Sequence, residues 1–216
     1  MSVVNNLLFD LDGTLTDPFL GITTCIQYAL EAMGHTPPER EALRWCIGPP
    51  LSQSFEQLLP NGDAAKAKEA LAKYRERFST VGLYENEVIP GIENQLKCLH
   101  ECGHRLFVAT SKPRIYAEQI IEHFNFIPYF ETIHGSELDG SLVHKEDLLA
   151  HILAEHELDP QHTTMIGDRE YDVHGAKAHG VHAVGVLWGY GSRDELERAG
   201  ADAIVERPEE LLALVY

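Results

Sequence analysis

The sequence predicts an α/β protein, with a parallel sheet covered by helices on both faces and an all-helical segment inserted near its start. After Pro90-Gly91, short apolar runs alternate with helical patterns, which is typical of a parallel sheet. From about residue 17 to 86, by contrast, apolar residues recur only at helical spacing. We therefore expect a core domain of residues 1–16 and 87–216, and a helical domain of residues 17–86.

The first strand is expected at Val3–Phe9, a mostly apolar run that ends at the turn Asp10-Leu11-Asp12-Gly13-Thr14. Further strands are expected at Arg105–Ala109, Thr132–His134, Thr163–Ile166, His182–Val186 and Ala203–Val205. Helices are expected at Phe19–Met33, Ser52–Leu59, Ala64–Phe78, Ile92–Cys102, Ile115–Phe124, Glu146–His156 and Tyr171–His179.

The composition and net charge of the chain limit the classes of partner that it is expected to bind. The chain has 216 residues, of which 44% are hydrophobic and 24% charged, a balance typical of a globular protein. Lys and Arg total 17 against 34 Asp and Glu, and the resulting net charge of −17 repels phosphate backbones and anionic lipid heads. We expect no nucleic acid and no membrane as partner, and a small phosphorylated metabolite remains compatible with this charge because a bound cation reverses it locally.

Localisation is expected to be cytoplasmic. The four cysteines have no disulfide-framework spacing, and the start of the chain has no basic flank followed by an apolar signal core. No run approaches the roughly 20 apolar residues of a membrane span. The twelve histidines show no metal-ligand spacing, and most are expected to face solvent.

Polar residues gather where the expected strands end. Parallel sheets bind ligands beyond the carboxyl ends of their strands, so these residues should lie around one crevice. They are Asp10, Asp12, Thr110, Ser111, Lys112, Lys145, Asp168 and Asp172.

The acidic members of this set suggest a metal ion. Asp10 and Asp12 point to the same side of an extended segment, and like charges so close require a cation, more so with Asp168 and Asp172 added. Oxygen ligands without His or Cys favour Mg²⁺ over zinc. The alternative is that Asp12-Gly13 forms a simple turn and Asp168 caps a helix.

A carboxylate beside Mg²⁺, a hydroxyl and a lysine form a site for a phosphoryl group. Asp10 would attack phosphorus while Lys145 neutralises the oxygens and Thr110 donates a hydrogen bond. Asp12 would serve as acid and then as base. The alternatives are that Thr110 and Ser111 cap a helix, and that Lys145 is a solvated lysine.

These segments resemble the four ordered motifs of the haloacid dehalogenase (HAD) superfamily of phosphatases. The motifs are Phe9-Asp10-Leu11-Asp12-Gly13-Thr14-Leu15, Ala109-Thr110-Ser111-Lys112, Lys145 and Gly167-Asp168-Arg169-Glu170-Tyr171-Asp172. The helical insertion resembles the cap of the subgroup that contains phosphoglycolate phosphatases and 5′-nucleotidase-like enzymes. The segment Val186-Leu187-Trp188-Gly189-Tyr190-Gly191 is also similar to that subgroup.

The resemblance implies a Rossmann-like core and a role for each motif residue. Asp10 would be nucleophile and Mg²⁺ ligand, Asp12 the acid and base with its backbone carbonyl on Mg²⁺, and Asp168 the third protein ligand. Asp172 would support these ligands, and Lys145 would pair with Asp10 and the phosphate. Phosphate-binding groups would come from Gly13, Thr110, Ser111 and Lys112.

The sequence departs from the family pattern at two positions. His144-Lys145-Glu146 replaces the more usual Lys-Pro, and Ser111 stands where phosphoglycolate phosphatases often have Asn. In the helical domain, Arg44 is the candidate for a contact with a substrate anion, the alternative being a surface arginine.

The predicted function is an Mg²⁺-dependent phosphomonoesterase of the phosphoglycolate phosphatase type, acting through an aspartyl phosphate as a monomer or homodimer. Alternatives are a 5′-nucleotidase, a sugar-phosphate phosphatase or mutase, and a switch that resembles a phospho-receiver. A dehalogenase would not need Asp12, and a phosphonate hydrolase would need a Schiff-base lysine, which the helix carrying Lys66, Lys68 and Lys73 does not single out.

Overall fold

The computed structural model describes residues 5–214 and divides into two compact units. One unit comprises the chain up to Asp17 and from Val88 onward, and the other comprises Pro18–Glu87. These boundaries lie one residue beyond the expected ones. Val3 and Val4, at the start of the expected first strand, lie outside the described residues.

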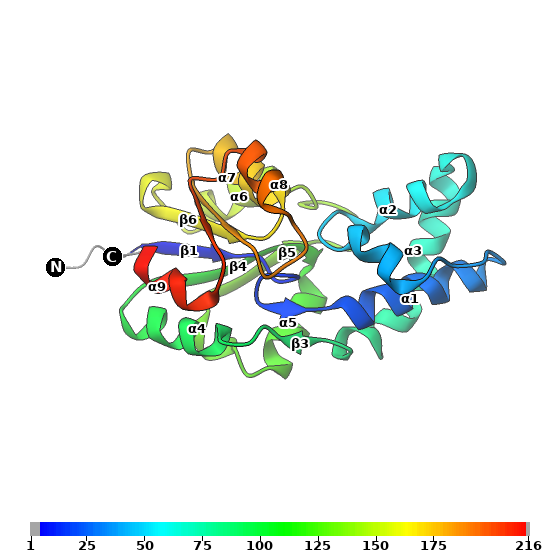
Figure 1. Cartoon of the computed structure of the whole chain (residues 1–216), viewed down its shortest axis with the longest axis horizontal. Helices are drawn as coiled ribbons and strands as arrows, with labels where there is room; N and C mark the ends of the chain where they lie inside the picture. The colour runs from blue at the N-terminus through cyan, green and yellow to red at the C-terminus, as the bar shows by residue number, and fades with distance from the viewer. Residues whose placement is uncertain (1–4, 215–216) are drawn as a thin grey trace. The chain divides into compact units, whose positions relative to one another are not determined.

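Within residues 5–214, the core unit contains a six-stranded sheet of strand order β5-β4-β1-β6-β7-β8, in which neighbouring strands pair in parallel (Figure 1). The strands are β1 (Asn6–Phe9), β4 (Arg105–Pro113), β5 (Thr132–Ser136), β6 (Thr163–Gly167), β7 (His182–Val186) and β8 (Ala203–Val205). Their predicted positions are confirmed, except that β1 begins at Asn6 and that β4, β5 and β6 run four, two and one residues further. Strand β4 has a register shift between Thr110 and Pro113.

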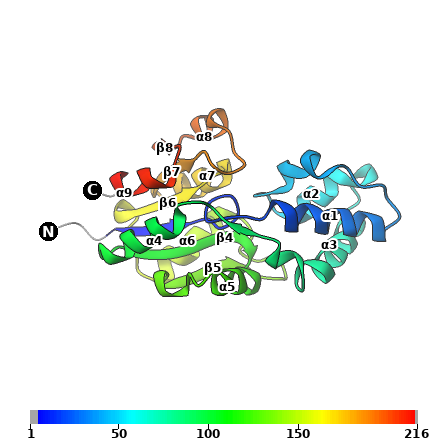
Figure 2. The same ribbon diagram turned by 60° about the horizontal axis from the view of Figure 1, so that its bottom comes forward.

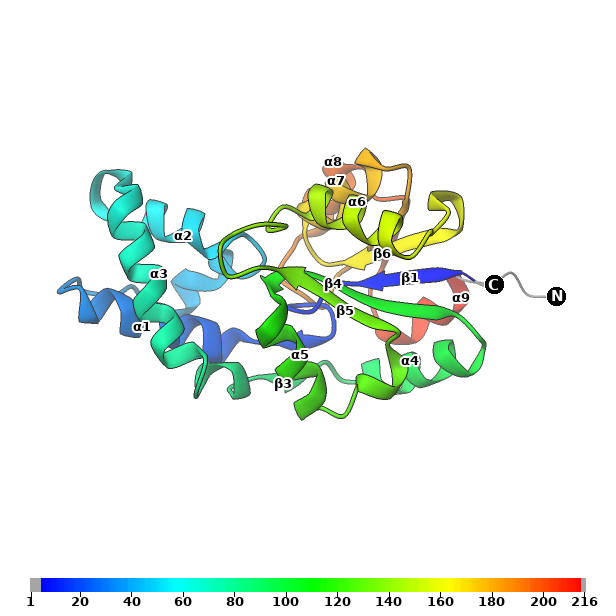
Figure 3. The ribbon, with the colours of Figure 1, turned by 180° about the vertical axis from the view of Figure 1, so that it is seen from behind.

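Helices cover both faces of this sheet. One face carries α6 (Lys145–Glu155), α7 (Glu170–Ala178) and α8 (Arg193–Ala199). The other carries α4 (Ile92–Glu101), α5 (Arg114–His123) and α9 (Leu211–Leu214), as the view from behind also shows (Figure 3). The chain steps outward from β1 through β4 to β5 and then returns to β6 on the other side of β1. The carboxyl ends of β4, β1 and β6 therefore form a topological switch point.

Apolar burial holds the first face together. Leu8, Phe107 and Ala109 of the sheet are fully buried in one cluster with Leu148 and Ile152 of α6. Removing this much apolar surface from water is the dominant stabilising term in folding, and it fixes α6 against the sheet. The start of α6 is thereby held near the strand ends where the polar residues gather.

The sequence prediction omitted α8, although a signal for it is present. The Ser192 side chain accepts a hydrogen bond from the Glu195 amide, and the helix ends at Gly200, which has a φ of +88°. Serine followed three residues later by glutamate marks a helix start, and a left-handed glycine commonly ends one.

The other unit contains the helices α1 (Phe19–Ala32), α2 (Leu51–Leu58) and α3 (Ala64–Phe78), which were predicted within one residue at either end (Figure 2). Helix α3 packs on both others, and Tyr74 stacks on Phe78 with ring centroids 5.0 Å apart. The segment Arg40–Cys46, which carries Arg44, forms a 3₁₀ helix. The short strands β2 (Thr16–Asp17) and β3 (Glu87–Val88) pair where the chain leaves and re-enters the core unit. None of the helices in residues 5–214 is both long and apolar enough to span a membrane.

Candidate active site

Sheet register brings the first acidic segment to the switch point. Phe9, the last residue of β1, pairs with Val108 on β4 and with Ile166 on β6. The Asp10 amide continues this pattern by donating to the Ile166 carbonyl at 2.9 Å. Asp10 therefore leaves the sheet between the ends of two neighbouring strands.

Lys145, the first residue of α6, joins two carboxylates at this position. Its Nζ lies 3.0 Å from Asp10 Oδ1 and 2.7 Å from Asp172 Oδ1, and it donates to the Ala109 carbonyl at 2.7 Å. Burial opposes the charged form of this lysine, but the charges of Asp10 and Asp172 outweigh burial and raise its pKa. Lys145 is a buried, charged group, so the alternative of a solvated lysine is wrong.

Asp168 is fully buried and closely surrounded. Its Oδ2 accepts from the Tyr190 amide at 2.7 Å and its Oδ1 from the Thr14 hydroxyl at 3.4 Å. Burial, followed by the charges of Asp10 and Asp172, raises its pKa well above the usual value for aspartate. The N-cap of α7 is Arg169, so Asp168 does not cap that helix.

Glycines make room for the Asp168 carboxylate. A Cβ on Gly13 or Gly189 would lie 2.4 Å from Oδ2 of Asp168. A Cβ on Gly191 would lie 1.9 Å from the backbone oxygen of Asp168. Gly13 also has a φ of +83°, which side-chain-bearing residues rarely adopt. Gly13, which was predicted to bind phosphate, is thus placed directly against Asp168.

The buried carboxylates of Asp10, Asp168 and Asp172 form one cluster, with one oxygen from each within 4.8 Å of the others. The Asp172 Oδ2 accepts a hydrogen bond from the Arg169 amide at 3.1 Å. Burial raises the pKa of Asp172 to about 6, against the opposing charge of Lys145. Three acidic groups against one buried ammonium leave an excess of negative charge, and an all-oxygen donor set suits a hard cation. The residues present therefore fit a metal ion.

The Asp12 carboxylate lies outside that cluster and forms its own ion pair. Lys112 Nζ lies 2.7 Å from Asp12 Oδ1, and both side chains are buried. Burial raises the pKa of Asp12, although Lys112 opposes this effect. Lys112 was predicted to bind phosphate, but here it forms an ion pair with Asp12, the predicted acid and base.

Thr110 and Ser111 lie in the irregular end of β4. The Thr110 hydroxyl accepts from the Lys112 amide at 3.2 Å, and the Ser111 carbonyl accepts from the Ser136 hydroxyl at 2.8 Å. The N-cap of α5 is Pro113, with no side-chain cap, so the alternative that Thr110 or Ser111 caps this helix is wrong. The bulge turns this stretch of backbone at the carboxyl edge of the sheet.

Arg44 belongs to the helical unit. Its guanidinium lies 5.3 Å from the centre of the Phe19 ring and 3.9 Å from Glu41, and its side chain is 51% exposed. An exposed ion pair of this length contributes little to stability.

The sequence prediction missed the part played by the segment after β7. The Tyr190 amide binds Asp168, and the indole of Trp188 donates to the Thr14 carbonyl at 3.0 Å. These bonds join this segment to the turn after β1. The two closely spaced glycines, 189 and 191, were the available signal, because glycine in such a run often permits close backbone approach.

Comparison with known proteins identifies the family. The model of the family described as haloacid dehalogenase-like hydrolase matches residues 7–186. The chain belongs to this family. Every motif residue described above, Arg44 included, lies within this match, whereas the segment after β7 lies beyond it.

Similar proteins agree on the fold and on phosphate chemistry. A 5′-nucleotidase of Pseudomonas aeruginosa PAO1 is 51% identical over 88% of this chain and 86% of its own length. The tyrosine-protein kinase PtkA of Mycobacterium tuberculosis H37Rv is 39% identical over 92% of this chain and 67% of its own. A crystal structure of a phosphatase predicted in Clostridium acetobutylicum has a TM-score of 0.94, with 42% identity and 99% of each chain covered. The haloacid dehalogenase-like chain described here is a phosphatase.

Proposed function

We propose that this phosphatase is an Mg²⁺-dependent phosphomonoesterase that works through an aspartyl phosphate on Asp10. The observation that carries this proposal is the position of Lys145, whose ammonium group contacts both Asp10 and Asp172 beside the buried Asp168. One cation among three carboxylates leaves room, electrostatically, for a metal ion. A lysine fixed in this way is also able to neutralise an incoming phosphate.

The metal ligands are proposed to be Asp10, Asp168 and the backbone carbonyl of Asp12, with Asp172 holding the Lys145 ammonium and the start of α7. When bound, Mg²⁺ supplies positive charge to the phosphate oxygens and to the Asp10 carboxylate. Thr110 and the backbone that follows it in the bulge are proposed to bind the phosphate, with Ser111 as the neighbouring donor. Gly13 contributes by allowing its turn to lie against Asp168.

The first chemical step forms a bond between an Asp10 carboxylate oxygen and phosphorus, and breaks the bond from phosphorus to the alcohol oxygen. Asp12, in its protonated form, gives its proton to the departing alcohol. Burial raises the pKa of Asp12 and so favours that protonated form. Lys112, 2.7 Å away, then stabilises the carboxylate that remains.

The second step hydrolyses the acyl phosphate. The Asp12 carboxylate takes a proton from water, whose oxygen attacks phosphorus and releases inorganic phosphate. Asp10 is regenerated as a carboxylate, and Lys145 again pairs with it. Asp12 returns to its protonated state, so the cycle is balanced.

The substrate is proposed to be a small phosphate ester, with nucleoside 5′-monophosphates as the first class to test. The name of the Pseudomonas aeruginosa relative at 51% identity supports this class. Phosphoglycolate, expected from the sequence, stays a prediction, as do sugar phosphates. Arg44 is proposed to bind an anionic or polar part of the substrate.

The test is phosphate release from a panel of nucleoside 5′-monophosphates, phosphoglycolate and sugar phosphates, with Mg²⁺ and again with EDTA. Catalytic release that is lost with EDTA, and lost in Asp10→Asn, is the expected result. Release that persists at the parent rate in Asp10→Asn would contradict the nucleophile assignment. Release that EDTA leaves unchanged would contradict the metal requirement.

Phosphoryl transfer to another acceptor is a second candidate. The observation that favours it is the 39% identity to a protein named as a tyrosine kinase, because the same aspartyl phosphate is able to pass its phosphoryl group to a hydroxyl. A mutase or a switch of the phospho-receiver type would use the same group. ATP added to the panel separates these outcomes: one phosphate per chain, or label transferred to protein, indicates transfer, and many turnovers indicate hydrolysis.

A further inference from the structure

A second group of potential metal ligands lies at the edge of the sheet. His134 on β5 is buried, and its Nε2 lies 2.9 Å from Nε2 of His156, which immediately follows α6. The two imidazole rings have centroids 5.1 Å apart and planes at 79°. The His156 ring also packs on Phe107, with centroids 4.9 Å apart. The pair is therefore fixed by packing from the sheet side.

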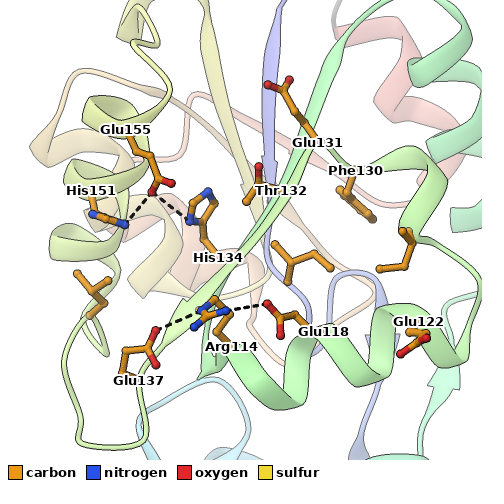
Figure 4. Close-up of a pocket in the computed structure, with 14 residues that line it drawn as sticks. Arg114, Glu118, Glu122, Phe130, Glu131, Thr132, His134, Glu137, His151 and Glu155 are labelled. Carbon is orange, nitrogen blue, oxygen red and sulfur yellow. Dashed lines mark hydrogen bonds and ion pairs between the residues drawn. The ribbon is translucent and has the colours of Figure 1, made fainter.

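His134 lines an open cleft of about 690 Å³ between β5, α5 and α6 (Figure 4). His134, His151 and Glu155 line one end of this cleft, and Arg114 lies further along it. The cleft gives a small ion access from solvent. The acidic cluster shares no residue with this group.

The charge state of the pair suits metal binding. Burial lowers the pKa of His134 to about 4, against the opposing charge of Glu155, and the neighbouring His156, His151 and Arg114 lower it further. His134 is thus neutral at pH 7, and a neutral imidazole is the form that binds metal ions. The two facing Nε2 atoms are close enough for one ion to bind both.

The ring spacing matches a tetrahedral ion. With zinc–nitrogen bonds of about 2.05 Å, two histidines on one tetrahedral ion have Nε2 atoms about 3.4 Å apart and ring centroids about 5.2 Å apart. The observed centroid distance of 5.1 Å already meets that value. Only a tilt of the rings is needed to separate the nitrogens from 2.9 Å.

Glu155 completes the ligand set. One of its carboxylate oxygens lies within 4.8 Å of a ligand atom from each of His134 and His156. Its Oε2 is 4.0 Å from His134 Nδ1 and 2.9 Å from Nε2 of His151, one helical turn earlier (Figure 4). The Glu155 side chain is 48% exposed and so has freedom to turn toward an ion. His151 would orient it, as outer partners commonly do for metal-bound carboxylates.

We propose that His134, His156 and Glu155 bind a divalent transition-metal ion, Zn²⁺ in the first instance, at a site separate from the catalytic cluster. Water from the cleft supplies the fourth ligand. Imidazole nitrogens select zinc-type ions, whereas the all-oxygen cluster at Asp10 selects Mg²⁺. One chain thus offers two sites of opposite chemical preference.

The test is zinc binding to the full chain after chelator treatment, in excess Mg²⁺ to fill the oxygen site, with a chromophoric zinc indicator as competitor. The wild type is expected to bind one Zn²⁺ per chain, and Co²⁺ in its place to give the intense visible absorption of a tetrahedral complex. His156→Gln, at a half-buried position, should weaken binding by at least about 100-fold, and Glu155→Gln by about 10-fold.

Two control variants locate the ion. His162→Gln changes a histidine that is 55% exposed and outside the group, and it should bind zinc like the wild type. Asp10→Asn should also retain tight zinc binding, because its change falls in the acidic cluster. Absence of saturable binding in the wild type, or unchanged affinity in His156→Gln, overturns the proposal and leaves the pair as a hydrogen bond between imidazoles. Loss of zinc binding in Asp10→Asn also overturns it, by assigning the ion to the acidic cluster.

Discussion

The acidic cluster and the histidine group differ in how the fold builds them. Asp10, Asp168 and Asp172 are buried and project from residues at or after the ends of neighbouring strands, and Lys145 offsets part of their charge. His134 and His156 meet at the outer strand, where His134 lines an open cleft and His156 packs on Phe107. The carboxylates are thus supported by close glycines and a lysine, whereas the imidazoles are held mainly by packing.

The most severe way to break the acidic cluster is Asp10→Asn. The side chain keeps its size, but the amide is a poor nucleophile, so phosphate release should fall by at least about 1000-fold. Initial rates at saturating substrate measure this loss. Thermal unfolding is the control: a variant that melts far below the wild type would have lost its fold rather than its nucleophile.

Lowering the pH is expected to destabilise the protein through His134. His134 has a pKa of about 4 when folded, against about 6.5 when unfolded. Between these two pH values the unfolded state binds more protons than the folded state. The free energy of unfolding therefore rises with pH through this range, and the stability that neutral His134 contributes is lost as the pH falls from about 6.5 to 4. The contribution is on the order of 3 kcal/mol.

Urea unfolding at pH 7 and pH 4.5 measures that term in the wild type and in His134→Gln. The glutamine variant removes the titrating group, so its loss of stability on acidification should be smaller by about that amount. Equal losses in both proteins would show that His134 contributes nothing to the acid response. Comparing the two proteins removes the contribution of the buried carboxylates, which both retain.

Gly189→Ala tests how tightly the acidic cluster is held. A Cβ there would lie 2.4 Å from Asp168, so the carboxylate or the segment after β7 must shift. We expect a loss of about 1–3 kcal/mol in the free energy of unfolding. The Mg²⁺ concentration for half-maximal activity should rise about 10-fold.

Gly103→Ala is the matched control, because that glycine has a φ of +85° and open space around it. It should lose stability through backbone strain alone, with an unchanged Mg²⁺ requirement. A Gly189→Ala protein with the wild-type Mg²⁺ requirement would show that Asp168 does not depend on its close backbone neighbours.

The smallest effect is expected for Arg44→Ala, which belongs to neither group. Its side chain is half exposed and its ion pair is long, so stability should change by less than about 0.5 kcal/mol. The KM for an anionic substrate should rise several-fold while kcat changes little, in steady-state assays across the substrate panel. An unchanged order of preference among substrates would remove Arg44 from the proposed substrate contacts.

Local sequence predicted the acidic cluster because its residues follow strands and lie in short motifs. The parallel order and the ends of β7 and β8 were also predictable, since apolar runs between helical patterns mark buried strands. The pairing of Lys112 with Asp12 was not predictable from the sequence. The strand is irregular between Thr110 and Pro113, so the alternation of side chains along it does not tell which way Lys112 points. The link from Tyr190 to Asp168 joins segments 22 residues apart, and only tertiary folding brings them together.

The histidine group was hidden from the sequence for a related reason. His134 and His156 are also 22 residues apart, without the short spacing of familiar metal motifs. Most of the twelve histidines are exposed, as expected, but His134 is one of those that are buried. The available signal was one histidine in an expected strand and another at the end of an expected helix. Such histidines also occur in ordinary cores, so this pattern did not point to a metal site.

Helix α6 begins at Lys145 and ends at Glu155, so one element contributes to both groups. Its 11 residues span about 15 Å, at about 1.5 Å a residue. Two paramagnetic ions, Mn²⁺ among the carboxylates and Cu²⁺ between the imidazoles, would lie near opposite ends of this helix. Their magnetic dipoles would couple through space, and the strength of that coupling would measure the distance between the two ions along this helix.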